Sequence, residues 1–202
     1  MLRSFKGITP KIAPSAFIEE SAQLIGDVEI GEESSVWFNC VLRGDVYHIR
    51  VGDYTNIQDG AVIHVTTGTY ATIIGNYVTV GHGVVLHGCT IQDRCLIGIG
   101  SIVLDNVTIG EDSLIGAGSL VTPGTVIPPR SLVMGAPARV RRSVTQEEVA
   151  RIDLHWRNYI EYKNAYKGEA VSDQQSAISS QRSAVSDQTV SESRGRSLMN
   201  KN

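Results

Sequence analysis

Aliphatic residues recur at every sixth position along most of the chain, from Ile12 to Val133, with pauses at two loops and a one-residue slip before Ile91. A glycine often follows directly, where a tight turn needs a residue without a Cβ atom. This period does not fit the 3.6-residue period of an α-helix. It predicts short parallel strands that stack coil upon coil, with the aliphatic side chains pointing into the bore. The residues in phase are Ile12, Ile18, Leu24, Ile30, Val36, Leu42, Val51, Ile57, Ile63, Ile74, Val80, Leu86, Ile91, Ile97, Val103, Ile109, Ile115, Val121, Ile127 and Val133.

The hexapeptide period over residues 12–138 resembles that of the left-handed β-helix superfamily of hexapeptide-repeat proteins. The resemblance implies triangular coils in which three hexapeptides complete one turn, and it implies the left-handed sense, which is an exception to the right-handed crossover rule. The expected fold class is therefore an all-β solenoid, a left-handed parallel β-helix of hexapeptide repeats with a C-terminal α-helix packed alongside.

That helix is predicted from a change of period after the repeats. Thr145 and Glu148 have the spacing of a helix-capping box. Apolar residues then recur at spacings of three and four, which predicts one amphipathic helix along the wall of the prism. The residues on this stripe are Val149, Ile152, Trp156, Tyr159 or Ile160, Lys163 and Tyr166.

The last part of the chain changes composition again. From Gly168 onward Ser, Gln and Asp dominate, and the segment AVSDQ occurs at 170–174 and again at 184–188. So little apolar surface cannot offset the entropy of ordering, so we expect 168–202 to be disordered. The predicted organisation is a β-helix domain at 1–140, a C-terminal amphipathic helix at 141–167 and this tail.

Charge and cysteine content exclude several classes of partner. A net charge of -3 and a pI near 5.9 provide no basic surface for nucleic acid or for anionic membranes. Neither a signal peptide nor an apolar run of membrane-spanning length is visible, so a cytoplasmic location is expected. The three cysteines form no C-x-x-C pair, which argues for buried thiols rather than for disulfides or a cysteine zinc site.

Counting hexapeptides places several polar residues on the outside of the prism. Leu42, Ile63 and Leu86 fall on one face of successive coils, so the residues that follow them, Arg43, His64 and His87, should form a column. Ile57 and Val80 share another face, and two residues after each come Asp59 and His82. These form a second column, around a corner of the prism from the first.

The two columns predict a metal site between subunits. Stacked His64 and His87 can both reach one ion at a Zn–N distance of about 2.0–2.1 Å. His82 lies around a corner of the same prism, so it could reach only an ion that is held by His64 and His87 of a neighbouring molecule. A ring of prisms that joins the two faces closes most simply as a trimer with three equivalent sites. In this register Arg43 of one subunit approaches Asp59 of the next. A surface or structural role for the histidines, and a plain interface ion pair for Arg43 with Asp45 or Asp59, are the alternatives.

The segments LRGD, NIQDGAVIH, VTVGHGVVLHGCT and GAPAR resemble the gamma class of carbonic anhydrases, more specifically the short bacterial gamma-class-like proteins, over residues 5–166. The resemblance implies a homotrimer that holds zinc, or iron(II) anaerobically, at His64, His82 and His87. It implies a hydrogen bond from Gln58 to the hydroxide on the metal, a place for Asn56 in the pocket wall, and a role for Arg43, paired with Asp45 and Asp59, in orienting bicarbonate and tying subunits together.

The implied reaction is the reversible hydration of carbon dioxide to bicarbonate. Three neutral imidazoles leave the ion its full charge and an open position, and water on such an ion has a pKa of about 7. Carbon dioxide has no charge to recognise, so an apolar wall is expected beside the metal. One coil beyond the histidines, the two columns continue with Leu104 and Ile99, which suit that wall.

The chain departs from the family's pattern where protons are exported. Family members carry glutamates after the LRGD motif and in a long loop after the first histidine, but this chain has Val46 and the segment VTTGTYA there. Without a carboxylate relay the rate should depend on buffer, and activity is expected to be low or absent. Tyr159 is expected either at the pocket mouth or as a packing residue.

Three other functions are compatible with the same prism. A hexapeptide acyltransferase would use one histidine as a general base and bind an acyl-CoA thioester, although three histidines at metal spacing exceed that need. A thioesterase or other hydrolase would use the same metal hydroxide. A non-catalytic gamma-class scaffold subunit is favoured by the missing relay and opposed by the retained Arg43, Gln58, Asp59 and histidines.

Overall fold

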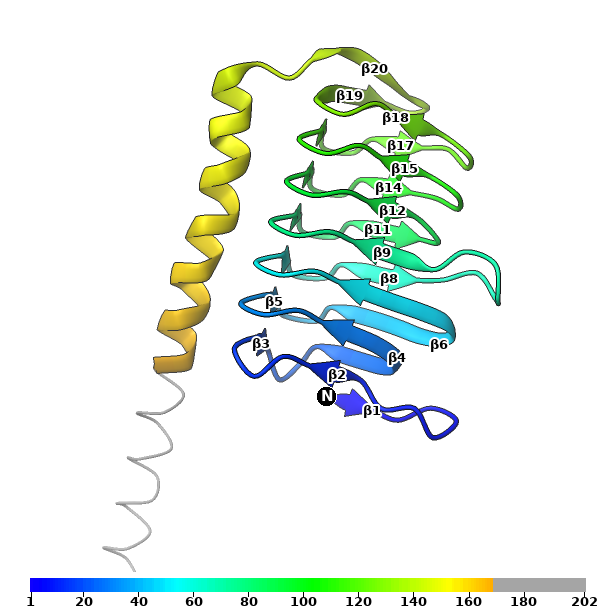
Figure 1. Ribbon diagram of the computed structural model, residues 1–202, viewed down its shortest axis with the longest axis vertical. Helices are drawn as coiled ribbons and strands as arrows, with labels where there is room; N and C mark the ends of the chain where they lie inside the picture. The colour runs from blue at the N-terminus through cyan, green and yellow to red at the C-terminus, as the bar shows by residue number, and fades with distance from the viewer. Residues whose placement is uncertain (169–202) are drawn as a thin grey trace, which may run out of the picture. The chain divides into compact units, whose positions relative to one another are not determined.

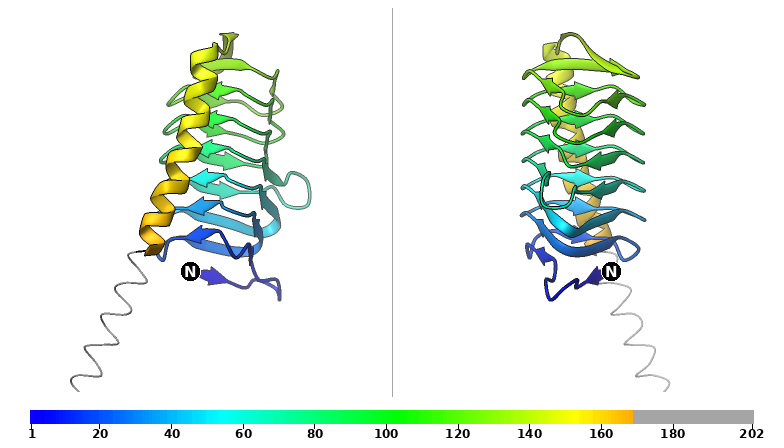
Figure 2. Two further views of the ribbon diagram at one scale, coloured as in Figure 1. Left: turned by 60° about the vertical axis from the view of Figure 1, so that its left-hand side comes forward. Right: turned by 90° about the vertical axis from the view of Figure 1, so that its right-hand side faces the viewer.

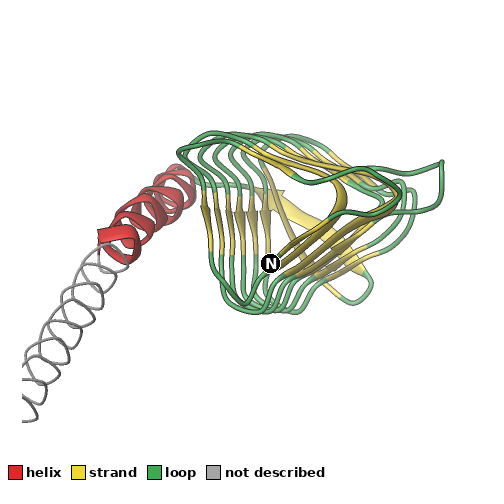
Figure 3. Ribbon diagram, turned by 90° about the horizontal axis from the view of Figure 1, so that it is seen from below, coloured by secondary structure: helices red, strands yellow, loops and turns green. Residues whose placement is uncertain are grey.

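The computed structural model of the protein describes residues 1–168, which fall into a unit over Met1–Glu161 and the start of a second unit at Tyr162. The first unit contains the β-helix and most of the C-terminal helix. Within it, short strands climb in parallel coils (Figure 1) that superpose as a triangle when the unit is seen end-on (Figure 3). The expected fold class is confirmed: the unit is a left-handed parallel β-helix of about seven turns with one C-terminal helix.

The strands are distributed over three faces, of which the first two form one continuous 12-stranded sheet because β4 and β6 each turn a corner. The first face contains β1 (Leu2–Arg3), the initial parts of β4 (Gln23–Ile30) and β6 (Val41–Val51), β8 (Val62–His64), β11 (Val85–His87), β14 (Ile102–Val103) and β17 (Leu120–Val121). The second face contains β2 (Lys11–Ile12), the final parts of β4 and β6, β9 (Thr72–Ile74), β12 (Thr90–Ile91), β15 (Thr108–Ile109) and β18 (Val126–Ile127).

The third face is a separate 8-stranded sheet. It contains β3 (Phe17–Ile18), β5 (Ser35–Val36), β7 (Asn56–Ile57), β10 (Thr79–Val80), β13 (Leu96–Ile97), β16 (Leu114–Ile115), β19 (Ser131–Gly135) and β20 (Ala138–Ser143). The last strand, β20, folds back antiparallel on β19 and closes the end of this sheet. A tight return here covers a strand edge that would otherwise be open to pairing with another chain.

The core is the bore of the prism, and most residues of the sixth-position series are buried in it together with other small and aliphatic residues. Leu42, Ile63 and Leu86 are fully buried and stand in register on the first face. Burial of each such aliphatic side chain stabilises the fold by about 1.5–3 kcal/mol. The three cysteines lie in the same core, where burial raises the pKa of Cys40 to about 11 and those of Cys89 and Cys95 to about 12.

A ladder of short polar side chains stabilises the corner between the second and third faces. Asp53, Asn76 and Asp93 each accept a hydrogen bond of 2.8 Å from a backbone N–H of the coil below. Each stands over a glycine; a Cβ atom on Gly75, for example, would lie 2.3 Å from Asp93 Oδ1. Aspartate and asparagine are therefore interchangeable in this ladder, because either one supplies the oxygen that caps the backbone.

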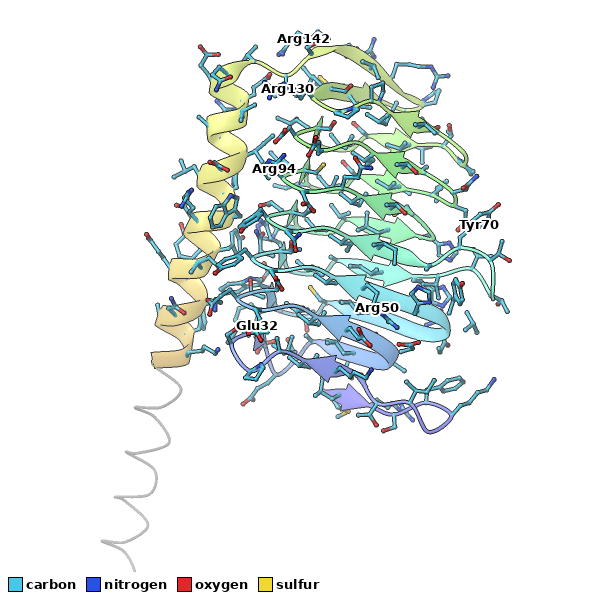
Figure 4. All side chains as sticks on the ribbon, viewed as in Figure 1. Glu32, Arg50, Tyr70, Arg94, Arg130 and Arg142 are labelled. Atoms are coloured by element: carbon cyan, nitrogen blue, oxygen red, sulfur yellow. The ribbon has the colours of Figure 1, made fainter. Side chains whose placement is uncertain are left out.

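The C-terminal helix spans residues 146–168. The predicted capping box is present: Glu148 Oε2 accepts from the Thr145 N–H at 2.9 Å, and Thr145 Oγ1 accepts from the Glu148 N–H at 3.3 Å. Arg142, at the end of the β-helix where the helix begins (Figure 4), also donates to Glu148 at 2.7 Å. This bond is the main reason that the pKa of Glu148 falls to about 2.

Aromatic contacts hold the helix, as far as residue 161, along the third face (Figure 2). The Trp156 ring lies 5.9 Å from Tyr54 and 5.0 Å from Tyr77, and these two tyrosines stack on each other at 5.2 Å. Tyr159 meets the buried Trp37 edge-on at 5.2 Å. The expected packing of the helix against the prism is thus observed.

The boundaries differ from the sequence prediction at one end. Residues 138–143 form β20, so the first part of the segment expected to be helical is extended, because it completes the third sheet by pairing with β19. The predicted disordered tail, 168–202, lies outside the described residues except for its first residue. Within residues 1–168, no helix has the length and apolar character needed to cross a membrane.

Candidate metal centre

Two histidines face each other at the edge of the first face. His64 ends β8 and His87 ends β11, and the two residues are direct partners in the parallel register. Their ring centroids are 5.1 Å apart, and His64 Nδ1 lies 3.1 Å from His87 Nε2. The column predicted from hexapeptide counting is present in the structure.

The outer nitrogen of each ring lies within hydrogen-bonding distance of a carboxylate. Asp45 Oδ1 lies 3.1 Å from His64 Nε2, and Asp105 Oδ1 lies 2.7 Å from His87 Nδ1. Arg43 donates to the other oxygen of Asp45 at 2.6 Å. Burial alone would raise the pKa of both aspartates, but the hydrogen bonds from Arg43 and His64 to Asp45, and from His87 and Thr66 to Asp105, outweigh it and hold both pKa values below the ordinary range.

This arrangement determines which ring nitrogens are available to a ligand. An ionised carboxylate only accepts hydrogen bonds, so His64 Nε2 and His87 Nδ1 carry the ring hydrogens. In neutral imidazoles the remaining nitrogens, His64 Nδ1 and His87 Nε2, then point lone pairs at each other across 3.1 Å. A cation between them removes that repulsion.

The donor set fits a tetrahedral metal ion such as zinc. Two nitrogens bound at about 2.0–2.1 Å to a tetrahedral zinc ion are about 3.3 Å apart, close to the separation in this pair. Metal-binding histidines generally donate their second N–H to a carboxylate or carbonyl, as His64 and His87 do here. The pair therefore has the spacing and the hydrogen-bond partners expected of two ligands in a tetrahedral site.

A second polar group lies at the corner that follows the third face. His82 Nδ1 is 2.8 Å from Asp59 Oδ2, and the two side chains are 46% and 42% exposed. Gln58 and Asn56 are buried beside them in sequence; Gln58 Nε2 donates to Asn56 Oδ1 at 3.1 Å, and Asn56 Nδ2 donates to Thr79 Oγ1 at 2.9 Å. Gly83, with a φ of +64°, forms the turn directly after His82.

The predicted site residues are therefore split into two groups within one chain. Arg43, Asp45, His64 and His87 lie together on the first face, whereas Asn56, Gln58, Asp59 and His82 come from the third face and its corner. Among residues 1–168, no cluster of three or more His, Cys, Asp or Glu side chains is arranged to hold a metal. A site that uses all three histidines needs two chains, and this assignment remains a prediction.

The remaining predicted residues take positions around these groups. Leu104 follows Val103, the partner of Leu86, and so stands one coil beyond His87. Ile99 is 57% exposed and stands one coil beyond His82. Tyr159 packs on Trp37, which lies one coil below Gln58, so its place at a pocket mouth also remains a prediction.

Two residues in contact with the histidine column escape prediction from sequence. Asp105 stands over Gly88, where a Cβ atom would lie 2.3 Å from Asp105 Oδ1, and extending the column count by one residue would have found it. Thr66 donates to Asp105 at 2.8 Å from the loop between β8 and β9. No periodicity covers that loop, so the contact depends on the path of the chain.

Histidines and carboxylates stacked on the outside of a hexapeptide prism define a hexapeptide-repeat protein with a polar site on its faces. The family model described as "Bacterial transferase hexapeptide (six repeats)" matches residues 88–123. This match covers two coils of the β-helix. It shows that the chain contains hexapeptide repeats, but it does not identify a reaction.

Similarity to named proteins identifies the family within this class of hexapeptide-repeat proteins. The chain is 54% identical over 149 residues to "Probable carbonic anhydrase" of Methanocaldococcus jannaschii, covering 74% of this chain and 93% of the relative. It is 44% identical to "Gamma carbonic anhydrase 1, mitochondrial" of Arabidopsis thaliana, over 79% of this chain and 60% of that relative. The protein belongs to the gamma carbonic anhydrase family. Enzymes of this family are in general metal-dependent.

A solved structure agrees on the fold but carries a different name. A crystal structure of a hexapeptide transferase family protein from Anaplasma phagocytophilum superposes with a TM-score of 0.79 and 41% identity, over 82% of this chain and 97% of that one. Membership of the family and the prism fold are thus clear. Because one fold can host many different reactions, the reaction of this protein depends on the side chains of its site.

Proposed function

We propose that the protein is a metal-dependent carbonic anhydrase that interconverts carbon dioxide and bicarbonate at the interfaces of a homotrimer. The observation that carries the proposal is the His64–His87 pair, whose facing nitrogens lie 3.1 Å apart and whose outer nitrogens are both held by carboxylates. A transferase that needs one general base has no use for two imidazoles locked face to face.

The third ligand is proposed to come from a neighbouring subunit. His82 is about half exposed at a different corner, so its ring is accessible to another chain. Three neutral imidazoles fit zinc, or iron(II) where oxygen is absent, and leave one coordination position open. When bound, such an ion supplies the Lewis acidity that turns water into a nucleophile near neutral pH.

The chain's own residues are proposed to bind and orient the substrate. The planar guanidinium of Arg43 donates to Asp45 at 2.6 Å and has further N–H groups, so it can hold an oxygen of bicarbonate. Gln58 and Asn56 are fixed to each other and offer uncharged polar groups from the buried end of the third face. Across the interface, Asp59 is proposed to pair with Arg43, in exchange for its contact with His82 in the single chain.

An apolar wall for carbon dioxide is proposed to come from Leu104 and Ile99. Each stands one coil beyond a histidine, and Ile99 is 57% exposed in the single chain. Tyr159 packs on Trp37, which lies three coils below this wall, and is proposed to reach the pocket mouth only if it leaves that contact.

Proton transfer to solvent is proposed to rely on buffer. Position 46 is a valine that is 37% exposed, and the loop at 65–71 carries threonine, glycine and tyrosine in place of a carboxylate. Each hydration event releases a proton, so a site without an internal acceptor must hand it to a buffer molecule or to water. The rate should accordingly rise with buffer concentration. A cytoplasmic location stays a prediction.

The decisive experiment combines metal analysis with carbon dioxide hydration by stopped flow, on protein loaded with zinc or anaerobically with iron(II). We expect about one metal per chain, hydration that accelerates with buffer concentration, and loss of both metal and activity in His82→Ala. A fully metallated protein without hydration activity would contradict the proposal, and acyl-CoA thioesters would then test the hydrolase and acyltransferase alternatives. Inactivity toward those as well would favour a scaffold subunit.

A further inference from the structure

Asp105 occupies a position that elsewhere in this prism has a purely structural use. In the ladder at the corner between the second and third faces, Asp93 stands over Gly75 and caps a backbone N–H of the coil below. Asp105 stands over Gly88 with the same close approach, 2.3 Å from the site of a Cβ atom. Its carboxylate, however, accepts hydrogen bonds from two side chains, His87 and Thr66.

Both contacts use the same oxygen and converge on the histidine. His87 Nδ1 lies 2.7 Å from Asp105 Oδ1, and Thr66 Oγ1 donates to that oxygen at 2.8 Å. The shared oxygen is therefore held from two directions. A ring that keeps this bond can neither flip nor exchange its tautomer, because either change would remove the N–H from the carboxylate.

The loop that carries Thr66 is itself anchored to the two histidine strands. Thr66 forms an antiparallel bridge to Tyr70, which lies on the projecting loop at the edge of the first unit (Figure 4). Thr72, where the loop enters β9, donates to the His64 carbonyl at 2.6 Å and accepts from the Gly88 N–H at 3.0 Å. The coils that carry His64 and His87 therefore also hold the Thr66 hydroxyl in place beside Asp105.

We propose that Asp105, held by Thr66, is a positioning residue that fixes the orientation and tautomer of His87 so that Nε2 faces a bound metal ion. The inference rests on the proposed function, because it concerns the same metal. Partners of this kind orient the ligand ring and increase its basicity, and their loss typically weakens metal binding by about 10–100-fold. Asp105 contacts no substrate in this scheme and acts only through His87.

The test is the affinity of the full-length oligomer for Zn²⁺, measured by competition with a chelator, together with the visible spectrum of the Co²⁺-substituted protein. Asp105→Asn keeps the size of the side chain, and Asn76 shows that an amide is accommodated over a glycine in this prism. We expect Zn²⁺ affinity to fall by about 10–100-fold and the Co²⁺ absorption bands to shift, because the uncharged amide is a weaker acceptor for the His87 N–H than the carboxylate and its NH2 group can also turn toward the ring. Asp93→Asn is the matched control, since it makes the same change over Gly75 away from the histidines, and it should retain wild-type affinity.

Thr66→Val is a second variant that leaves the coils intact. It removes the hydroxyl but not the Asp105–His87 bond, so a smaller loss of affinity is expected than for Asp105→Asn. Unchanged affinity in both Asp105→Asn and Thr66→Val, with metal bound normally by the wild type, would overturn the inference and leave the proposed function standing. An equal loss in Asp93→Asn would also overturn it, because the effect would then be a general one on the coils. Failure of the wild type to bind metal would overturn both.

Discussion

Mixing two inactive variants tests whether the metal site is shared between chains. His64→Ala removes a proposed ligand on the first face, and His82→Ala removes the proposed ligand at another corner, so each variant alone should hold almost no metal after dialysis against a chelator. Both side chains are at least partly exposed, at 20% and 46%, and neither fills the bore, so both variants should fold and assemble.

The division of the ligands determines how much metal the mixture recovers. In a closed trimer made from equal amounts of the two variants, a site forms when one chain retains His64 and the neighbour that faces it retains His82. Any trimer that contains both variants has one such junction, so about a third of its sites are restored. If all three ligands came from one chain, every chain would lack one of them and nothing would be restored.

The assay is co-expression of two differently tagged variants, isolation of oligomers that carry both tags, and measurement of tightly bound zinc and of carbon dioxide hydration. A matched control mixes the wild type with the double variant His64→Ala/His82→Ala. In trimers that contain both kinds of chain, a shared site then gives on average about a sixth of the wild-type metal, and a site within one chain gives about half. Correctly sized mixed oligomers without recovered metal would refute the assignment of His82 to a neighbouring subunit.

Three further predictions concern stability and reactivity. Leu86→Ala removes a fully buried side chain from the middle of the bore and should lower the free energy of unfolding by about 2–5 kcal/mol in chemical denaturation; a loss below 1 kcal/mol would show that the coils close over the cavity. The pKa of Glu148 is lowered to about 2 by Arg142, so its stabilisation is present above the ordinary glutamate pKa of about 4.3 and is lost as the pH falls toward 2. The melting temperatures of wild type and Glu148→Gln should therefore differ most at neutral pH and converge on acidification, and a constant difference would contradict this sign. Finally, the three buried cysteines, with pKa values raised to about 11–12, should resist iodoacetamide at pH 8 in the native protein and react after denaturation, as measured by mass spectrometry.

The alternative functions leave different signatures in the same experiments. An acyltransferase would tolerate the loss of a metal ligand other than its general base and would require a thioester donor. A scaffold subunit would bind metal and assemble without turning over carbon dioxide. Because the family is established and the fold is shared with a protein named as a transferase, the metal stoichiometry of the histidine variants distinguishes these functions more sharply than the fold does.

Much of the structure follows from the sequence because a β-helix is nearly one-dimensional. Each coil contacts mainly its neighbours, so the period of six together with three hexapeptides per turn determines which residues share a face and which lie directly above one another. The partnership of His64 with His87, and that of Ile57 with Val80, could be counted from the sequence and are present in the register. The capping box at Thr145 and Glu148 was equally local, since its partners are three residues apart.

The hexapeptide period does not predict the path of the loops, the pairing of the last strand or the hydrogen-bond partners of the histidines. These were decided by the tertiary structure. The extended conformation of β20 depends on a free edge of β19, which no local preference in that segment reveals. The contact of Thr66 with Asp105 joins residues 39 apart in the chain through a loop that has no repeat. The tautomers of the histidine pair follow from Asp45 and Asp105, whose oxygens lie within hydrogen-bonding distance only once the coils are stacked. The sequence by itself thus determined the prism and the histidine columns, because strand stacking repeats at a constant interval, whereas loop paths and hydrogen-bond partners were decided by distances that only the folded chain establishes.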